Sequence, residues 1–95
     1  MTISRLFQFI ESSVYEGREN LPVKGLVYDS RKAEAGDVFV ALKGSRSNGH
    51  DFVPEVLARG AYAVVQEGFY KPEDRVFKVA DTRKALAYLS KAYFN

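Results

Sequence analysis

The sequence predicts an α/β domain, a small mixed β-sheet of about four to five strands flanked by about three helices. Apolar residues recur at helical spacing near both ends of the chain. Two continuous apolar runs of strand length, residues 38–42 and 61–65, occupy the middle. Such runs are typical of strands covered on both faces. A short helical pattern and a glycine separate them, which indicates a crossover connection between neighbouring strands.

Length and composition limit the classes of protein to consider. The 95 residues predict one domain, over positions 1–95, with a modest core. The chain contains no run of about 18 apolar residues and no signal-like apolar stretch near its start, so we expect no membrane span and no secretory signal. It has no cysteine and one histidine, which excludes disulfides and Cys- or His-rich metal sites and indicates a cytoplasmic protein.

The first predicted element is an amphipathic helix that starts after Thr2 or Ser4 and ends near residue 12 or 13. Its apolar residues recur at helical spacing: Ile3, Leu6, Phe7, Ile10 and Val14. A polar loop follows over 16–22. Residues 23–28 are predicted to form the first strand, and two turns follow it at 29–32 and 33–37. Gly36 can take a positive φ angle in the second turn.

The middle of the chain is predicted to form strand, helix and strand. Residues 38–42 form the second strand, and a polar loop over 43–50 leads to a helix that Asp51 caps. Pro54 falls in its first turn, where the amides lack helical partners. The helix is expected to run through Arg59 and to stop at Gly60, directly before the third strand at 61–65.

The last part is predicted to contain a loop, a short strand and a long helix. Residues 66–74 are polar and include Pro72, so they are expected to form an exposed loop. Residues 76–79 follow as a strand. Asp81 is a good N-cap for a helix from Thr82 to about Tyr93. The spacing of these elements leaves the order of the strands open.

Polar side chains collect at the ends of the first two predicted strands. Tyr28 ends the first apolar run and Asp29, Ser30 and Arg31 follow it, and the loop over 43–50 follows the second run. Ligand-binding groups usually lie on loops that a rigid scaffold holds, so these ends are predicted to form the wall of a small-molecule site at a sheet edge. The alternative from the residues alone is a pair of ordinary exposed turns.

The side chains of these loops suit an anionic ligand with a heterocycle. Tyr28 can stack on a base. Four hydroxyl or amide side chains can hydrogen-bond a neutral ring: Ser30, Ser45, Ser47 and Asn48. Three cations can face phosphate, with backbone amides near Gly44: Arg31, Lys43 and Arg46. From residue 24 to residue 46 there are five basic and three acidic residues, which would also fit a solvated surface.

The same residues argue against several other functions. The chain contains neither the Gly-x-x-x-x-Gly-Lys-Ser/Thr loop of ATP sites nor Gly-x-Gly-x-x-Gly. A triad from Ser45 or Ser47 with His50 and Asp51 would crowd three groups into one loop, which rarely gives triad geometry. The formal net charge of +2 is weak and the aromatic residues mostly fit buried positions, so we expect no nucleic-acid partner. A binding module without catalytic residues remains.

Five ordered blocks of this sequence resemble the N-terminal domain of the Mur ligases. They are residues 27–32 (Val-Tyr-Asp-Ser-Arg-Lys), 36–44 (Gly-Asp-Val-Phe-Val-Ala-Leu-Lys-Gly), 48–52 (Asn-Gly-His-Asp-Phe), 60–65 (Gly-Ala-Tyr-Ala-Val-Val) and 81–87 (Asp-Thr-Arg-Lys-Ala-Leu-Ala). The resemblance covers nearly the whole chain, from about residue 6 to residue 94. It implies the fold of that N-terminal domain.

The resemblance also implies a ligand and the residues that bind it. In this family the domain holds the UDP end of a UDP-MurNAc-peptide substrate. Residues at the positions of Tyr28 and Ser30 line the pocket for uracil and ribose, and those at Ser45, Arg46 and Ser47 contact the uridine and diphosphate side. The loop that holds these three varies within the family. The block around His50 is expected to shape the turn into the next helix.

The resemblance places catalysis outside this chain. The full family enzyme is an ATP-dependent acid–amino-acid ligase of bacterial peptidoglycan synthesis, and so serves cell shape and division. It has a central ATPase domain, which is expected to bind ATP and Mg²⁺, and a C-terminal domain. This domain is expected to bind no cofactor and no metal, and to have no ligase activity alone. The lead-in at residues 26–28 and the ending at 92–95 favour the branch that adds the third residue of the stem peptide. The alternatives are the branch that adds D-Ala-D-Ala and a free-standing nucleotide-binding domain.

Overall fold

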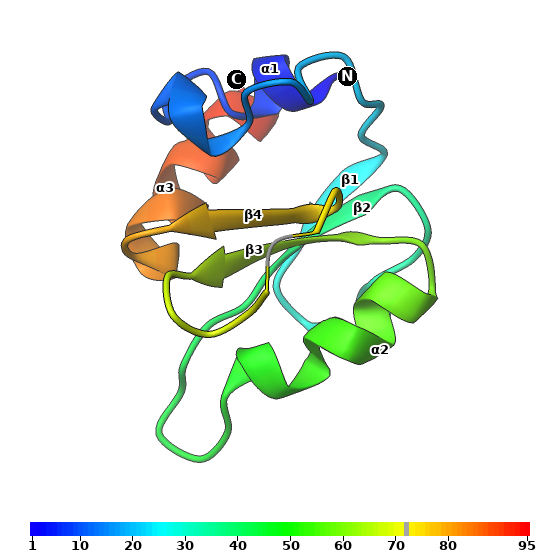
Figure 1. The fold of residues 1–95 in the computed structure, drawn as a ribbon, viewed down its shortest axis with the longest axis vertical. Helices are drawn as coiled ribbons and strands as arrows, with labels where there is room; N and C mark the ends of the chain where they lie inside the picture. The colour runs from blue at the N-terminus through cyan, green and yellow to red at the C-terminus, as the bar shows by residue number, and fades with distance from the viewer. Residues whose placement is uncertain (72) are drawn as a thin grey trace.

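A four-stranded parallel sheet forms the centre of the computed structural model, which describes residues 1–71 and 73–95. Its strands are β1 (Gly25–Val27), β2 (Asp37–Val40), β3 (Tyr62–Gln66) and β4 (Val76–Val79), and they lie in the order β1-β2-β3-β4 (Figure 1). Val38 lies between Leu26 and Tyr62, and Ala63 pairs with Val76. All four carboxyl ends therefore meet at one edge of the sheet.

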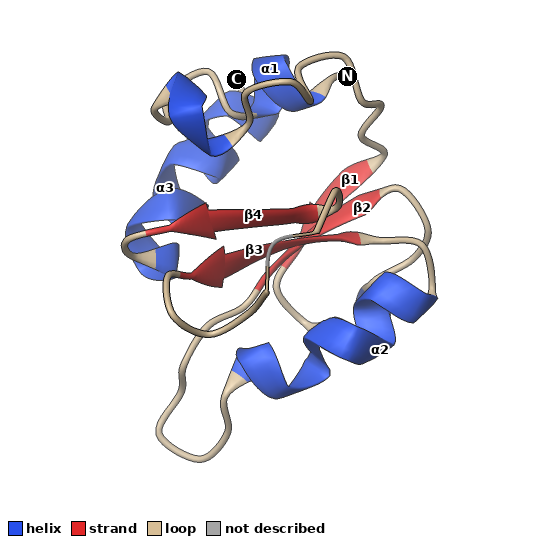
Figure 2. Cartoon of the chain, viewed as in Figure 1, coloured by secondary structure: helices blue, strands red, loops and turns tan. Residues whose placement is uncertain are grey.

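Helices cover both faces of this sheet (Figure 2). α1 (Ile3–Leu6) and α3 (Thr82–Tyr93) pack together on one face, and α2 (Val53–Ala58) lies on the other. The described part of the chain also contains three short 3₁₀-helices: η1 (Ser12–Val14), η2 (Ser30–Lys32) and η3 (Gly49–Phe52). Among the residues described, no helix is long and apolar enough to cross a membrane.

The core is split into two layers by the alternation of side chains along the strands. Val38, Val40 and Phe77 point toward α1 and α3. There they pack in one cluster with Leu6 of α1 and Leu89 of α3. The strand residues between them point to the other face, among them Phe39, Ala63 and Val65. There they pack against the apolar side chains of α2, which are Val53, Val56 and Leu57. Because neighbouring strand residues point to opposite faces, a strand covered on both sides must be apolar throughout. The continuous run at residues 38–41 meets that requirement.

The predicted α/β class is confirmed, with four strands and three α-helices among the residues that the structure describes. The sheet is parallel throughout, however, and not mixed as predicted. The connection from β2 to β3 is the crossover expected from the sequence, through α2. The connections from β1 to β2 and from β3 to β4 also return the chain to the opposite end of the sheet, although neither contains an α-helix within the described residues.

Helix boundaries differ from the predictions at two places. α1 ends at Leu6, because the backbone already leaves helical geometry at Phe7 (φ −92°, ψ 15°), and only the 3₁₀-helix η1 follows. α2 starts at Val53, because the side chain of Asn48, and not Asp51, caps the 3₁₀-helix η3 in front of it. Pro54 lies in the first turn of α2, as predicted.

Other local predictions are confirmed. Asp81 caps α3 by accepting hydrogen bonds from the amides of Arg83 (2.9 Å) and Lys84 (3.2 Å). Gly36 and Gly60 have φ angles of 88° and 93°, which favour glycine. Pro72, part of the loop predicted at 66–74, lies outside the described residues.

Candidate functional site

A cavity of about 760 Å³ lies where β1 and β2 end. Residues that follow these two strands line it, together with side chains from α2, η3 and the start of α3. Tyr28, Ser30 and Ser47 are the predicted site residues that it brings together. Ligands of open parallel sheets bind at the carboxyl ends of the strands, so the cavity lies where the topology favours binding.

The loop after β1 is held by Asp29. One carboxylate oxygen accepts hydrogen bonds from the backbone N–H (3.0 Å) and the Nε (3.1 Å) of Arg31, and the other accepts from its Nη2 (2.9 Å). These hydrogen bonds lower the pKa of Asp29 to about 2. The guanidinium of Arg31 therefore binds the carboxylate of Asp29. The sequence analysis had predicted that it could face phosphate.

Arg59 fixes the position of Ser30 from the opposite side of the loop. It lies at the end of α2, and its Nη1 donates to the carbonyl oxygens of Ser30 (2.6 Å) and Ala33 (3.5 Å). Its Nη2 lies 3.4 Å from a carboxylate oxygen of Glu55, which also lines the cavity. No local pattern pointed to Arg59, because its partner lies 29 residues away in the chain.

The loop after β2 is a tight turn. The amide of Gly44 donates to the carbonyl of Ser47 (2.8 Å), and Lys43 and Asn48 form an isolated antiparallel bridge. Ser47 and Gly44 line the cavity. Ser45 and Arg46 lie at the exposed tip of the turn and outside the cavity lining.

His50 anchors this loop to the sheet. It is 6% exposed, and its Nδ1 lies 2.7 Å from the side-chain oxygen of Asn48. Its Nε2 accepts a hydrogen bond from the backbone amide of Gln66 (2.9 Å), at the end of β3. Nδ1 therefore carries the proton of a neutral ring. Because both nitrogens are engaged, His50 serves the loop and is not a free base for Ser45 or Ser47.

We expect the protein to become less stable as the pH falls, because His50 becomes protonated. Burial lowers the pKa of His50 from its ordinary value of 6.5, and Asp51 only partly opposes this shift. A lowered folded pKa means that the neutral ring stabilises the fold fully above pH 6.5, and that this contribution is lost as the pH falls toward the folded pKa.

Urea unfolding at about pH 7.5 and about pH 5.5 checks this expectation. His50→Gln serves as the matched variant because His50 is the only histidine. The wild type should lose more stability than the variant between the two pH values. An equal loss in both proteins would contradict the assigned role.

The walls of the cavity combine aromatic, apolar and cationic groups. Tyr28 is 66% exposed and Phe52 is 39% exposed, so both present ring surface to a ligand, while Phe39 is buried in the core beneath. Arg83 enters from α3, and its Nη2 donates to the carbonyl of Lys43 (3.0 Å). Apolar surface with a few convergent polar groups is typical of small-molecule sites. The sequence interpretation missed Phe52, Arg59 and Arg83.

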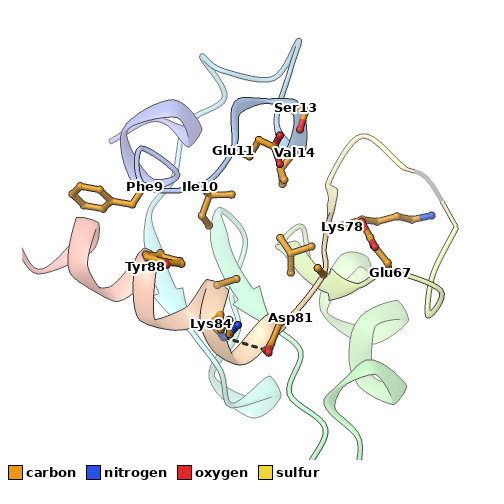
Figure 3. A pocket seen from close by; sticks show the side chains of 13 residues that line it. Phe9, Ile10, Glu11, Ser13, Val14, Glu67, Lys78, Asp81, Lys84 and Tyr88 are labelled. Atoms are coloured by element: carbon orange, nitrogen blue, oxygen red, sulfur yellow. Dashed lines mark hydrogen bonds between the residues drawn. The ribbon is translucent and has the colours of Figure 1, made fainter.

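A second cavity, of about 500 Å³, lies between η1, the end of β4 and α3 (Figure 3). Phe9 and Tyr88 line it on one side and Lys78 and Glu67 on another. The carboxylate of Asp81 also lines it but is occupied in capping α3. This cavity contains none of the predicted site residues, so the cavity beside β1 and β2 is the better candidate.

Comparison with known proteins points to one family. The model described as "Mur ligase family, catalytic domain" matches residues 22–94. The UDP-N-acetylmuramoyl-L-alanyl-D-glutamate–2,6-diaminopimelate ligase of Clostridium perfringens is 41% identical over 99% of this chain and 20% of its own length. The enzyme of the same name from Aquifex aeolicus is 43% identical over 76% of this chain and 15% of its own length.

Solved structures agree with this match. A crystal structure of MurF from Acinetobacter baumannii has a TM-score of 0.72 and 38% identity, and the match covers 96% of this chain and 20% of that one. MurF ligase from Thermotoga maritima, in complex with ADP, has a TM-score of 0.64 and 38% identity over 73% of this chain and 16% of its own. This chain thus spans about a fifth or less of the length of these relatives.

Proposed function

Since this chain belongs to the Mur ligase family, we propose that its cavity binds the UDP end of a UDP-MurNAc-dipeptide. The observation that carries the proposal is the convergence of Tyr28, Ser30 and Ser47 on one cavity from loops 17 residues or more apart, with the ring of Phe52 beside them. Aromatic rings stack on a base, and hydroxyl groups hydrogen-bond its edge or the ribose.

The contacts proposed for Ser45 and Arg46 need a further step. Both side chains lie on the exposed tip of the turn between Gly44 and Ser47. We propose that this tip closes over the bound nucleotide. Exposed loops that carry binding residues commonly make such adjustments on binding.

We propose that the parent protein adds 2,6-diaminopimelate to UDP-MurNAc-L-Ala-D-Glu, in the bacterial cytoplasm. Relatives that align with nearly the whole chain carry the name of that ligase, among them proteins from Clostridium perfringens and Cytophaga hutchinsonii. The second candidate is the D-alanyl-D-alanyl-adding ligase. It is favoured by the 38% identity to that enzyme of Acinetobacter baumannii over 96% of this chain.

We propose that this chain does not itself hold ATP and Mg²⁺. The sequence contains no phosphate loop of the Gly-x-x-x-x-Gly-Lys-Ser/Thr type. Among the described residues, no group of three or more His, Cys, Asp or Glu side chains is placed to hold a metal ion. We propose that other domains of the parent ligase bind both; that the family binds an adenine nucleotide is supported by the Thermotoga maritima relative, solved in complex with ADP. The chain alone should then consume no ATP when given UDP-MurNAc-dipeptide, and ATP consumption by it would contradict this.

Titration of the isotope-labelled chain with UDP, and separately with ATP, tests the site. UDP should shift the amide resonances of Tyr28, Ser30, Ser47 and Phe52. ATP should not shift this set, because the pocket is proposed to read uracil. If UDP leaves all four resonances in place, the proposed site is wrong.

Ser30→Ala is expected to weaken UDP binding about five- to tenfold, the effect of losing one hydroxyl hydrogen bond. Ser12→Ala is the matched control, because Ser12 is an exposed serine of η1 outside the cavity. The two affinities can be measured by the same titration. Equal affinity of both variants would contradict a contact between Ser30 and the ligand.

A further inference from the structure

The cations that line the cavity differ from those that the sequence placed there. Three arginines reach it: Arg31, Arg59 and Arg83. Arg31 is paired with Asp29, and Arg59 is paired with Glu55. Among the residues described, Arg83 takes part in no ion pair within 4.0 Å. Of the three arginines in the described lining, Arg83 is therefore the one whose charge no carboxylate neutralises directly.

The guanidinium of Arg83 keeps donors for a ligand. Its Nη2 donates to the carbonyl of Lys43 at 3.0 Å, which orients the group. For the described part of the chain, its Nε and Nη1 have no hydrogen-bond partner in the structure. The nearby carboxylate of Asp81 accepts from two backbone amides at the start of α3 and caps that helix. A planar guanidinium with unused N–H groups matches phosphate oxygens in a two-pronged geometry.

The fold brings Arg83 to this position from the far face of the sheet. α3 packs on the face opposite α2, which supplies Glu55 and Arg59 to the same cavity. The contact with Lys43 places the guanidinium at the start of the turn after β2, next to the backbone of Gly44. The amide of Gly44 donates to the carbonyl of Ser47 (2.8 Å), so the guanidinium of Arg83 supplies the donors for an anion at this end of the strand.

We propose that Arg83 binds the diphosphate of the nucleotide in this cavity. The proposal rests on the proposed function, since it assigns one part of the same ligand to one side chain. Arg59 holds the loop at Ser30, where the nucleoside is proposed to lie, and Arg83 supplies the charge for the phosphates. The nucleoside and the diphosphate are thus recognised by different residues.

The test compares uridine, UDP and inorganic diphosphate as probes, with the wild type, Arg83→Gln and Arg83→Lys. Lys84→Gln is the matched control, because it removes one positive charge from the next position of α3 at a residue outside this cavity. Wild type should bind UDP more tightly than uridine. Arg83→Gln should weaken UDP binding about tenfold to a hundredfold and leave uridine binding unchanged. Arg83→Lys should recover part of the loss.

The outcomes separate this inference from the proposed function. If wild type binds neither uridine nor UDP, the proposed function fails. If Arg83→Gln weakens uridine and UDP equally, Arg83 only supports the carbonyl of Lys43, and the inference is wrong while the site stands. If Arg46→Gln causes the loss specific to UDP and Arg83→Gln does not, the turn tip binds the diphosphate and the inference is overturned. Amide spectra of each variant establish that it is folded.

Discussion

Phe77→Ala is expected to cost about 3–5 kcal/mol of unfolding free energy. Phe77 is fully buried in β4, and its ring centroid lies 4.9 Å from that of Phe7 and 6.2 Å from that of Tyr62. The guanidinium of Arg18 lies 4.0 Å above the same ring. Removal of the ring would leave a cavity between the sheet and α1. This cavity cannot collapse fully, because backbone segments hold its walls on both sides.

Urea unfolding of Phe77→Ala measures this loss. A small domain has a total stability of about 5–15 kcal/mol, so the variant should be marginal or unfolded. Phe9→Ala is the matched control, because Phe9 is 38% exposed and belongs to neither core layer. It should lose less than about 1 kcal/mol. Similar losses in both variants would show that the layer around Phe77 is not what holds α1 on the sheet.

Gly49→Ala is expected to destabilise the protein by about 1–3 kcal/mol and to weaken UDP binding. A Cβ atom at Gly49 would lie 2.7 Å from the amide nitrogen of Leu42, 3.0 Å from its carbonyl oxygen and 3.2 Å from the Cα of Ala41. These are backbone atoms at the end of β2, so they cannot rotate away. The amide of Gly49 also donates to the carbonyl of Leu42 at 2.7 Å. The substitution therefore pushes the loop out of the cavity wall.

Gly68→Ala separates this steric effect from backbone strain. Gly68 has a φ angle of +91°, and a Cβ atom there would meet nothing within 4 Å. The control should lose about 1–2 kcal/mol from its backbone conformation alone and bind UDP normally. Urea unfolding and a UDP titration of both variants give the comparison. Unchanged UDP affinity in Gly49→Ala would mean that the packing of Gly49 on Leu42 does not shape the site.

Local chemistry made several elements predictable. The continuous apolar runs at 38–42 and 61–65 predicted buried strands, because a strand covered on both faces cannot carry polar side chains. Asp81 predicted the start of α3, since its side chain can reach amides two and three residues ahead. Tyr28, Ser30 and Ser47 were predicted on the segments that follow the first two strands, and the structure places all three in the lining of one cavity.

Other features depended on contacts between distant parts of the chain. The first helix was predicted too long, because apolar spacing continues to Val14 while the backbone leaves helical geometry at Phe7. The strand directions were predicted as mixed, because hydrophobic runs carry no information on which way a connection returns.

The sequence by itself determined the class of the fold and the capping of α3, since both depend on neighbours in the chain. The tertiary structure alone decided the parallel sheet, which places the ends of β1 and β2 side by side. It also decided the contacts of Arg59 and Arg83, whose carbonyl partners lie 29 and 40 residues away. A guanidinium at the end of a long side chain can serve any loop that the fold brings near, and only the packing of α2 and α3 on opposite faces selects which one.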